Sequence, residues 1–372
     1  MAVPSSREAN REASREASDA RITGVSAVIC NYNGEGYLEE CLRAVLAQGA
    51  DEVIVVDDAS TDGSVALVRQ RFPGVELLQL DRNRGPCAAR NAGMRAARRR
   101  WVLAVDNDAM LEPGVLARLR AALEAHPEAV VAQARAVVYE EPTRVHYDGG
   151  GFHYAGGIAL RNFYTPIAEA EGTGVVAVDA LCAMCALVDR DVVLARGGYD
   201  EDLFYLSEDL DLSLRLRLAG ERLIAVEDAL VRHRGGTAGL SFRGGNYPEQ
   251  RTYLHARNRL WIRYKCLCWR TLVLAWPGFA LYEVTWVLFA LLQGQLGAYV
   301  RGRLAFLRAW PKVMRARAAV QAQRRVPDRA LLVGGPLTLT PALLRSGPRR
   351  AAARVLDAAL RAWWALVRPM CG

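Results

Sequence analysis

The 372-residue sequence lacks the patterns that mark several common classes of protein. Its eight cysteines show no paired zinc-ribbon spacing, and a chain of this length builds its core without disulfide staples. Cys182 and Cys185 form a C-x-x-C, but an apolar run continues past them, which favours buried small residues over a redox pair. No signal peptide is recognisable, because Met1–Ala20 repeats a polar Arg-Glu-Ala pattern typical of a disordered or fraying tail. These absences favour a reducing compartment over secretion.

Two phosphate-binding signatures are also missing. After the apolar run Val25–Cys30 the sequence reads Asn-Tyr-Asn-Gly-Glu-Gly and not G-x-G-x-x-G, which argues against an NAD-dependent dehydrogenase. The stretch Val25–Gly36 also offers no glycine-rich loop with a basic residue, which a sugar-1-phosphate nucleotidyltransferase needs. Both of these enzyme classes are therefore disfavoured.

Positive charge is concentrated at the C-terminal end. The whole chain carries a net charge of +8, and Gln295–Gly372 alone contains 15 Lys/Arg against two Asp. Such an excess suits nucleic acid or an anionic membrane surface. The hydrophobic stretch Thr271–Gln293 lies next to it, so we expect the membrane and not nucleic acid as the partner.

The stretch Thr271–Gln293 has Glu283 as its only charge and is long enough to cross a hydrocarbon core of about 30 Å. Pro277-Gly278 and the central Glu283 instead favour a broken hairpin or a helix in the membrane interface. Basic residues on both sides suit a segment that dips in and returns to the cytoplasm, and a buried pair of core helices is the alternative. The spacing over Ala351–Val367 predicts a further amphipathic helix.

Short apolar strands alternate with helical segments in the first part of the chain. The expected strands are Val25–Cys30, Glu52–Val56, Val75–Leu80 and Trp101–Val105, and the expected helices are Tyr37–Gln48, Ser64–Arg71 and Cys87–Arg98. Continuous apolar strands in this order predict an α/β fold with a mostly parallel sheet covered on both faces. In such sheets ligands bind at the carboxyl ends of the strands.

Polar residues follow three of these strands: Asn31-Tyr32-Asn33, Asp57-Asp58 and Asp106-Asn107-Asp108. Asp106 and Asp108 are spaced to share one hard divalent cation, Mn²⁺ or Mg²⁺, or to hold it together with a ribose. A polar turn with capping aspartates is the alternative. Convergence of the three strand ends favours a binding site.

The same strand ends supply candidates for nucleotide contacts. Asp58 is placed to accept a hydrogen bond from a uracil or thymine imide, and Tyr32 to stack on the base. Further candidate contacts are Asn33, Asp57, Arg84 and Arg90; the two arginines are placed to reach phosphate oxygens or are solvated helix charges.

Two candidates come from later in the chain. Glu208 and Asp209 begin the helical pattern Glu208–Leu218, where Ser207 as N-cap would account for acids in the first turn. A carboxylate at a helix N-terminus also suits a general base that deprotonates a hydroxyl. His233, after the strand-like Leu223–Val231, is a third metal ligand, a diphosphate contact or a structural histidine. The Gly-rich stretch 149–157 predicts a hairpin or a loop near an acceptor site.

Taken together, these blocks resemble the family 2 glycosyltransferases, especially the rhamnosyltransferase-like members. The resemblance spans about residues 25–265 and rests on Val-Ile-Cys-Asn-Tyr-Asn-Gly (28–34), Val-Ile-Val-Val-Asp-Asp-Ala-Ser-Thr-Asp-Gly (53–63), Asn-Arg-Gly-Pro-Cys-Ala-Ala-Arg-Asn-Ala-Gly (83–93), Asp-Asn-Asp (106–108), Gly-Gly-Tyr-Asp-Glu-Asp-Leu-Phe (197–204), Ser-Glu-Asp-Leu-Asp-Leu (207–212) and His233. It implies a GT-A fold, a Rossmann-like mixed sheet flanked by helices. Cys30-Asn31 departs mildly from the family pattern.

The resemblance also implies roles. Tyr32 and Asp58 would contact the nucleobase, Asp106 and Asp108 the ribose and metal, and His233 would lie near the metal. Asp209, within the Glu208-Asp209 pair, would be the catalytic base. The implied reaction inverts the anomeric centre and moves a sugar from a UDP- or dTDP-sugar to an acceptor hydroxyl, on a lipid-linked or cell-surface glycan.

The Gln-x-x-Arg-Trp block of processive synthases is missing, and the nearest text is Arg257-Asn-Arg-Leu-Trp261, which favours transfer of a single sugar. The alternatives are transfer to a polyprenyl phosphate, where a base is less necessary, and a non-catalytic membrane scaffold, which predicts damaged carboxylates. We expect a tail over 1–22, a catalytic domain over 23–265, a hydrophobic and basic membrane-association region over 266–325, and a basic tail over 326–372. The expected location is the cytoplasmic face of the membrane.

Overall fold

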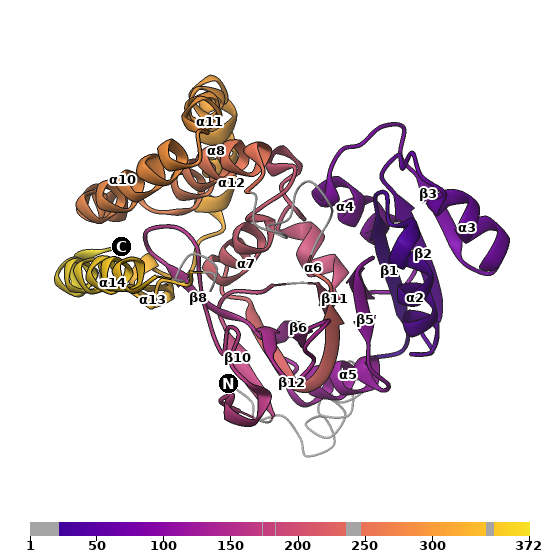
Figure 1. The fold of residues 1–372 in the computed structure, drawn as a ribbon. Helices are drawn as coiled ribbons and strands as arrows, with labels where there is room; N and C mark the ends of the chain where they lie inside the picture. Colours follow the sequence, from indigo (N-terminus) through magenta and orange to yellow (C-terminus); the bar gives the residue numbers. More distant parts are fainter. Residues whose placement is uncertain (1–21, 173, 183, 236–246, 340–345) are drawn as a thin grey trace, which may run out of the picture.

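A mixed β-sheet of ten strands organises the chain. The computed structural model describes residues 22–172, 174–182, 184–235, 247–339 and 346–372. Helices cover both faces of the sheet, and a group of C-terminal helices stacks beside it (Figure 1). The repeated Arg-Glu-Ala segment expected to form a tail lies outside the described residues.

The first half of the sheet is parallel, as the alternating pattern predicts. Its strands lie in the order β3-β2-β1-β4, and every residue of β1 and β2 is buried. The bounds of these elements are β1 (Val25–Asn31), β2 (Glu52–Asp57), β3 (Glu76–Gln79), β4 (Trp101–Asp106), α2 (Glu35–Leu46), α3 (Ser64–Arg71) and α4 (Pro86–Ala96). Burial on both sides explains why these strands are continuous apolar runs.

The second half of the sheet is mixed, which differs from the mostly parallel sheet that the first strands suggest and agrees with the sheet of a GT-A fold. β11 is antiparallel to both β4 and β6, β12 is parallel to β6, and β10 closes the edge. The short strands β5 and β7 pair with β12 and β6. The bounds are β5 (Ala109–Leu111), α5 (Val115–Ala125), β6 (Ala129–Val138), β7 (Val145–Tyr147), η1 (Ile167–Glu169), β10 (Val175–Val178), β11 (Cys185–Asp189), α6 (Arg190–Ala195), η2 (Glu201–Leu203), α7 (Glu208–Leu218) and β12 (Arg222–His233).

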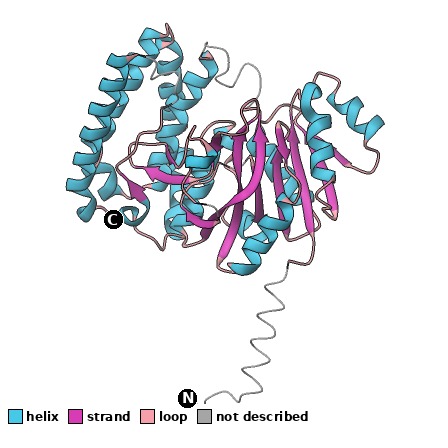
Figure 2. Cartoon of the chain, turned by 60° about the horizontal axis from the view of Figure 1, so that its bottom comes forward, coloured by secondary structure: helices cyan, strands magenta, loops and turns pink. Residues whose placement is uncertain are grey.

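The C-terminal part of the chain is helical. Figure 2 shows these helices as a layer beside the sheet. Their bounds are α8 (Glu249–Cys266), α9 (Trp269–Leu274), α10 (Trp276–Leu292), α11 (Leu296–Arg308), α12 (Trp310–Ala322), α13 (Asp328–Leu331), α14 (Gly347–Val367) and η4 (Arg368–Met370). Among the described residues, no helix combines the length and the apolar character that crossing a bilayer requires.

The hydrophobic stretch 271–293 is interrupted, as its proline predicts. α9 ends at Leu274 and α10 begins at Trp276, with Pro277 in the first turn of α10, where a missing backbone N–H does no harm. Glu283 does not face lipid in isolation. It lies 2.9 Å from Arg259 and 3.4 Å from Arg263, and it also pairs with Arg303. Its charge therefore fastens α10 to α8 and α11.

The segment 326–372 is not a tail in this structure. β13 (Leu332–Val333) pairs in parallel with β8 (Gly150–His153), which forms a hairpin with β9 (Ile158–Leu160). The Tyr154 hydroxyl donates to the Leu360 carbonyl at 3.2 Å, and the Tyr154 ring stacks on Trp364 at 4.9 Å. The amphipathic helix expected near 351–367 is therefore present as α14, but it completes the core.

Candidate functional site

The carboxyl ends of β1, β2 and β4 meet at one edge of the sheet, and a pocket of about 1230 Å³ opens there. Residues from the sheet, from α7 and from the C-terminal helices line it. The predicted site residues among them are Tyr32, Asp58, Arg90, Asp106, Asp108, Glu208, Asp209 and His233. The expected convergence of polar strand ends is therefore present.

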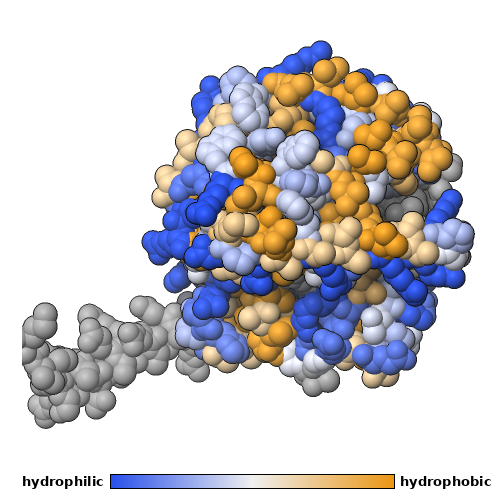
Figure 3. All heavy atoms as spheres, turned by 90° about the vertical axis from the view of Figure 1, so that its left-hand side faces the viewer, coloured by the Kyte–Doolittle hydropathy of each residue, from blue (hydrophilic) through white to orange (hydrophobic). Residues whose placement is uncertain are grey.

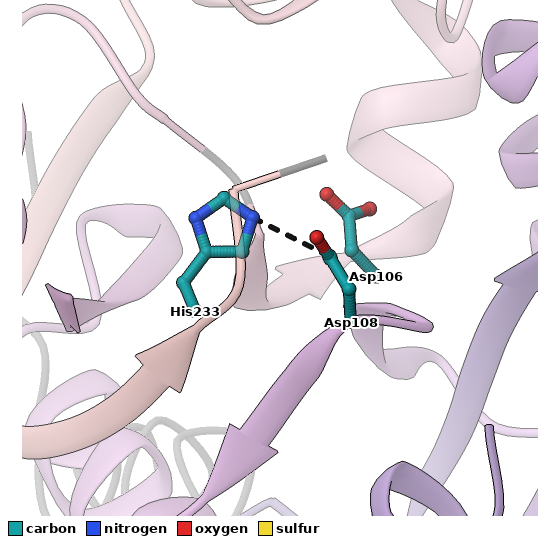
Figure 4. A group of neighbouring side chains, drawn as sticks. All are labelled: Asp106, Asp108 and His233. Carbon is teal, nitrogen blue, oxygen red and sulfur yellow. Dashed lines mark ion pairs between the residues drawn. The ribbon is translucent and has the colours of Figure 1, made fainter. Parts of the chain in front are cut away.

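Asp106, Asp108 and His233 form a candidate metal centre. Each offers a ligand atom within 4.8 Å of the others, and Nε2 of His233 lies 3.4 Å from Oδ1 of Asp108. Figure 4 shows the imidazole ring pointing toward the two carboxylates. The register explains this meeting, because β5 pairs with the end of β12 and sets Ala109, the neighbour of Asp108, opposite His233.

The donor set fits a divalent cation. Two carboxylates and one imidazole suit Mn²⁺ or Mg²⁺, with Mn²⁺ accepting the nitrogen more readily. His146 supports this geometry, because its Nδ1 lies 3.2 Å from Nδ1 of His233. That contact leaves Nε2 of His233 facing Asp108, as an outer partner does for a metal-bound histidine.

Arg90 lies beneath the site and joins two of its carboxylates. Its guanidinium is 2.6 Å from Asp106 and 3.3 Å from Glu208, and it lies 5.1 Å from the ring centre of Tyr199. The side chain is only 7% exposed. Although Arg90 lines the pocket, its charge is engaged by these carboxylates, so its placement supports positioning of the acids more than the predicted contact with phosphates.

The first turn of α7 presents Glu208 and Asp209 differently. Both residues line the pocket, but Glu208 is buried and paired with Arg90, whereas Asp209 is partly exposed. Ser207 occupies the N-cap position, but its side chain makes no capping hydrogen bond and its φ is 68°. The simple N-cap explanation of this turn is therefore wrong.

The segment before α7 is strained. Phe204, Leu206 and Ser207 all have positive φ, at 62°, 69° and 68°, although none of them is glycine. Such backbone costs about 1–3 kcal/mol per residue and persists only where the surroundings impose it. Here it delivers the pocket-lining residues 204–210 and the first turn of α7 to the site. No helix or strand pattern in the sequence signals this conformation.

Asp58 anchors a loop and also lines the pocket. Its carboxylate accepts hydrogen bonds from the backbone N–H groups of Arg84 and Gly85, each at 2.7 Å. Burial raises the pKa of Asp58, and these hydrogen bonds oppose that shift. Tyr32 also lines the pocket, and its neighbour Asn31 accepts a hydrogen bond from the Asp58 backbone N–H at 2.8 Å, so the two nucleobase candidates come from adjacent strand ends.

Three predicted nucleotide contacts do not line this pocket. Asp57 is buried and accepts hydrogen bonds from Asn31 and Ser60. Asn33 accepts one from the Thr61 backbone N–H at 2.8 Å. Both hold the strand-end loops together.

The guanidinium of Arg84 pairs with Glu201 at 2.8 Å in a separate depression. Only its backbone reaches the site, through Asp58. The structure therefore does not bring the Arg84 guanidinium to the pocket, and its contact with phosphates stays a prediction.

One side of the pocket is lined by aromatic rings that the sequence patterns did not predict. His146 stacks on Tyr147 at 4.0 Å, and Tyr147 stacks on Phe163 at 5.8 Å. These rings and Tyr164 line the pocket next to His233. They come from β7 and the irregular segment after β9, where the only signal was an unusual density of tyrosine and glycine. Apolar ring faces of this kind are suited to pack against a sugar.

All eight cysteines are free thiols. Cys185 is buried in β11 and Cys182 lines the pocket. Burial raises the pKa of both thiols. Cys185 is therefore buried as expected, whereas Cys182 is partly exposed to the pocket; the raised thiol pKa values disfavour redox chemistry at this pair.

Parts of the sequence are similar to known proteins. Residues 26–193 match the family model described as "Glycosyl transferase family 2". The chain is 42% identical over 102 residues to the succinoglycan biosynthesis protein ExoO of Rhizobium meliloti (strain 1021), which is 27% of this chain and 29% of that protein. It is 25% identical over 243 residues to the amylovoran biosynthesis glycosyltransferase AmsE of Erwinia amylovora, which is 62% of this chain and 84% of that protein.

Among solved structures, the crystal structure of GalNAc-T7 with UDP, GalNAc and Mn²⁺ superposes with a TM-score of 0.53 and 16% identity. The superposition covers 69% of this chain and 51% of that one. At this identity the likeness concerns the fold alone.

The mixed sheet and the carboxylate–histidine cluster at its strand ends define an α/β domain of the GT-A type. Over residues 26–193 the chain is similar to glycosyl transferase family 2. The matched region contains Asp106 and Asp108 and ends before Asp209 and His233. The placement of the last two residues therefore comes from the structure.

Proposed function

We propose that this protein transfers a single sugar, with inversion, from a UDP- or dTDP-sugar to an acceptor hydroxyl on a lipid-linked or cell-surface glycan. One observation carries the proposal. The metal-centre residues Asp106, Asp108 and His233 line the same pocket as Asp209 and as the nucleobase candidates Tyr32 and Asp58. The names of the relatives, in succinoglycan and amylovoran biosynthesis, support polysaccharide assembly as the setting.

Asp106, Asp108 and His233 would hold the divalent cation. When bound, it supplies positive charge that offsets the charge of a leaving diphosphate. Arg90 keeps Asp106 in place through its 2.6 Å contact. His146 holds the imidazole of His233 in orientation.

Asp209 is the proposed general base. It stands in the first turn of an 11-residue helix, where the backbone dipole favours an ionised carboxylate. From the pocket wall it takes the proton of the acceptor hydroxyl as that oxygen attacks the anomeric carbon of the donor. Glu208 is paired with Arg90, so we assign it to positioning and not to proton transfer.

Donor recognition is proposed for the end of the pocket formed by Tyr32 and Asp58. The Tyr32 ring supplies a stacking surface, and Asp58 keeps acceptor capacity beyond its two backbone hydrogen bonds. A pyrimidine with an imide N–H fits this pair, which favours uracil or thymine nucleotides.

A thermal-shift screen of nucleotide sugars with Mn²⁺ tests the proposal. A true donor raises the melting temperature by mass action, by an amount equivalent to about 2.7 kcal/mol at 100 times its Kd. Asp108→Asn or a chelator should abolish both this shift and sugar transfer. Asp228→Asn is the matched control, because Asp228 is an exposed acid outside the pocket. A donor shift and transfer rate that persist unchanged in chelator would refute the metal role.

A further inference from the structure

One surface of the C-terminal helices exposes large apolar side chains. We call it the apolar face, and it comprises Trp269, Val273, Trp276, Leu281, Val284, Val287, Leu288, Leu291 and Leu292 from α9–α10 and Leu296, Val300, Leu304 and Leu307 from α11. Their exposures range from 37% to 83%. Figure 3 shows apolar residues gathered over the upper part of this side of the molecule. Exposed apolar surface on this scale marks an interaction site.

The packing of α10 explains why these residues point outward. Glu283 ties one side of the helix to Arg259 and Arg263 of α8, and Phe279 and Ala290 are buried on the inner side. The opposite side then presents valines and leucines to the exterior. α11 continues the surface, since Leu296, Val300, Leu304 and Leu307 recur every three or four residues.

Positive charge predominates around the apolar face, and the exposed Glu249 of α8, which lies beside α11, is paired with Arg301. Between Trp269 and Arg308 the only acidic residue in the sequence is Glu283, and its carboxylate forms ion pairs with arginines of α8 and α11. Arg270 and Arg308 are exposed beside Trp269 and Leu307, and no carboxylate of the described residues lies within 4.0 Å of either guanidinium. An apolar surface rimmed by cations is complementary to an anionic lipid surface.

Other occupants fit the observations less well. A second copy docking face to face would gather Arg270 and Arg308 of both copies at one apolar interface, where their like charges repel. In the part of the chain that the structure describes, no helix is long and apolar enough to cross a membrane. Trp269 and Trp276, with exposures of 52% and 64%, are instead of the type that settles at the boundary between lipid and water.

We propose that α9, α10 and α11 dock on the surface of an anionic bilayer, with the apolar face lying in the headgroup boundary. Phe289 of α10 and Gln293, the C-cap of α10, line the pocket, so docking through Leu288 and Leu292 sets this side of the pocket next to the lipid. The docking itself is independent of the proposed reaction. The predicted cytoplasmic side of the membrane stays a prediction.

Vesicle flotation of the full chain, without donor or acceptor, tests the docking. The protein should float with phosphatidylglycerol–phosphatidylcholine vesicles and bind phosphatidylcholine vesicles much more weakly. The triple variant Leu288→Ser, Leu291→Ser, Leu292→Ser should lose at least about 100-fold in partitioning, because each leucine surrenders buried apolar area. Leu46→Ser is the matched control, since Leu46 is 42% exposed on α2, across the molecule from the apolar face (Figure 1), and should bind normally.

A charge variant keeps the test independent of folding. Arg270→Gln with Arg308→Gln leaves the leucines in place and should weaken binding to anionic vesicles by about fivefold per residue, with no effect on neutral vesicles. Equal flotation of the triple variant and the wild type would overturn the proposal. So would wild-type protein that does not bind anionic vesicles and forms a dimer that the triple variant abolishes.

Discussion

Replacing Arg90 with methionine probes the ion pairs beneath the candidate site. The Arg90 side chain is 7% exposed and contacts Glu208, which is 9% exposed, and Asp106, which is 27% exposed. Methionine keeps much of the apolar volume and removes the charge. Glu208 then loses its buried cationic partner, whereas Asp106 is better hydrated and contributes less to the loss.

The free energy of unfolding that Arg90→Met loses depends on how the variant accommodates Glu208, which can stay charged or take up a proton. An unpaired buried charge costs about 3–5 kcal/mol. Protonating the carboxyl instead costs about 3.7 kcal/mol at pH 7, because glutamate in water ionises near pH 4.3. The variant takes the cheaper route, so we expect a loss of about 3 kcal/mol in the free energy of unfolding at pH 7.

The stability loss caused by Arg90→Met should become smaller as the pH falls. In the variant the folded state holds the Glu208 proton more tightly than the unfolded chain does, so acid stabilises the variant relative to the wild type. At pH 5 the cost of protonation falls to about 1 kcal/mol. The loss caused by Arg90→Met should therefore shrink as the pH falls from 7 to 5.

Urea denaturation in metal-free buffer at both pH values measures these losses. Arg43→Met is the control, because Arg43 pairs with Glu39 at the solvent-exposed surface of α2 and its loss should change stability much less than the loss of Arg90. The double variant Arg90→Met, Glu208→Gln should regain part of the stability, since glutamine leaves no charge behind. A loss below about 0.5 kcal/mol at pH 7, or an equal loss at both pH values, would refute the reasoning.

Two further predictions concern the base and a buried histidine. Asp209→Asn should cut kcat by about 10²–10⁴-fold, while donor binding measured by thermal shift is kept. As the control, Asp191→Asn changes an exposed acid in the first turn of α6 and should leave kcat unchanged. A normal kcat for Asp209→Asn would reject the assignment of Asp209 as the base. His153 accepts a hydrogen bond from the Ala155 N–H at 3.1 Å, and burial lowers its pKa to about 4. Because the unfolded chain takes up this proton near pH 6.5, stability should fall by up to about 3.4 kcal/mol as the pH drops from 6.5 to 4, and His153→Gln should flatten that slope in urea titrations at each pH.

Local pattern was sufficient to predict the parallel half of the sheet and most of the site. Strands buried on both faces must be continuous apolar runs, and β1 and β2 are such runs. The carboxyl ends of parallel neighbours lie at one edge, which is why Asp58 and Asp106 could be placed together from their positions alone. The start of α7 at Glu208 and its end at Leu218 were likewise readable from spacing.

The directions in which side chains point could not be predicted from local sequence pattern. Arg84 lies just before α4 and Arg90 lies within it, yet Arg84 pairs outside the pocket with Glu201 and Arg90 pairs within it with Asp106. The difference depends on which carboxylates the distant η2 and α7 segments bring near, and sequence spacing does not encode that. The same holds for Asp57, whose neighbours Asn31 and Ser60 absorb its hydrogen bonds.

The sequence by itself determined the elements, the parallel core and the acidic strand ends, because these follow from burial and periodicity along a few residues. Only the tertiary structure decided that His146 orients His233, that strained backbone precedes Asp209, and that α14 completes the core. Each of these depends on contacts between residues far apart in the chain. Such contacts are chosen by the packing of whole elements, which no local pattern specifies.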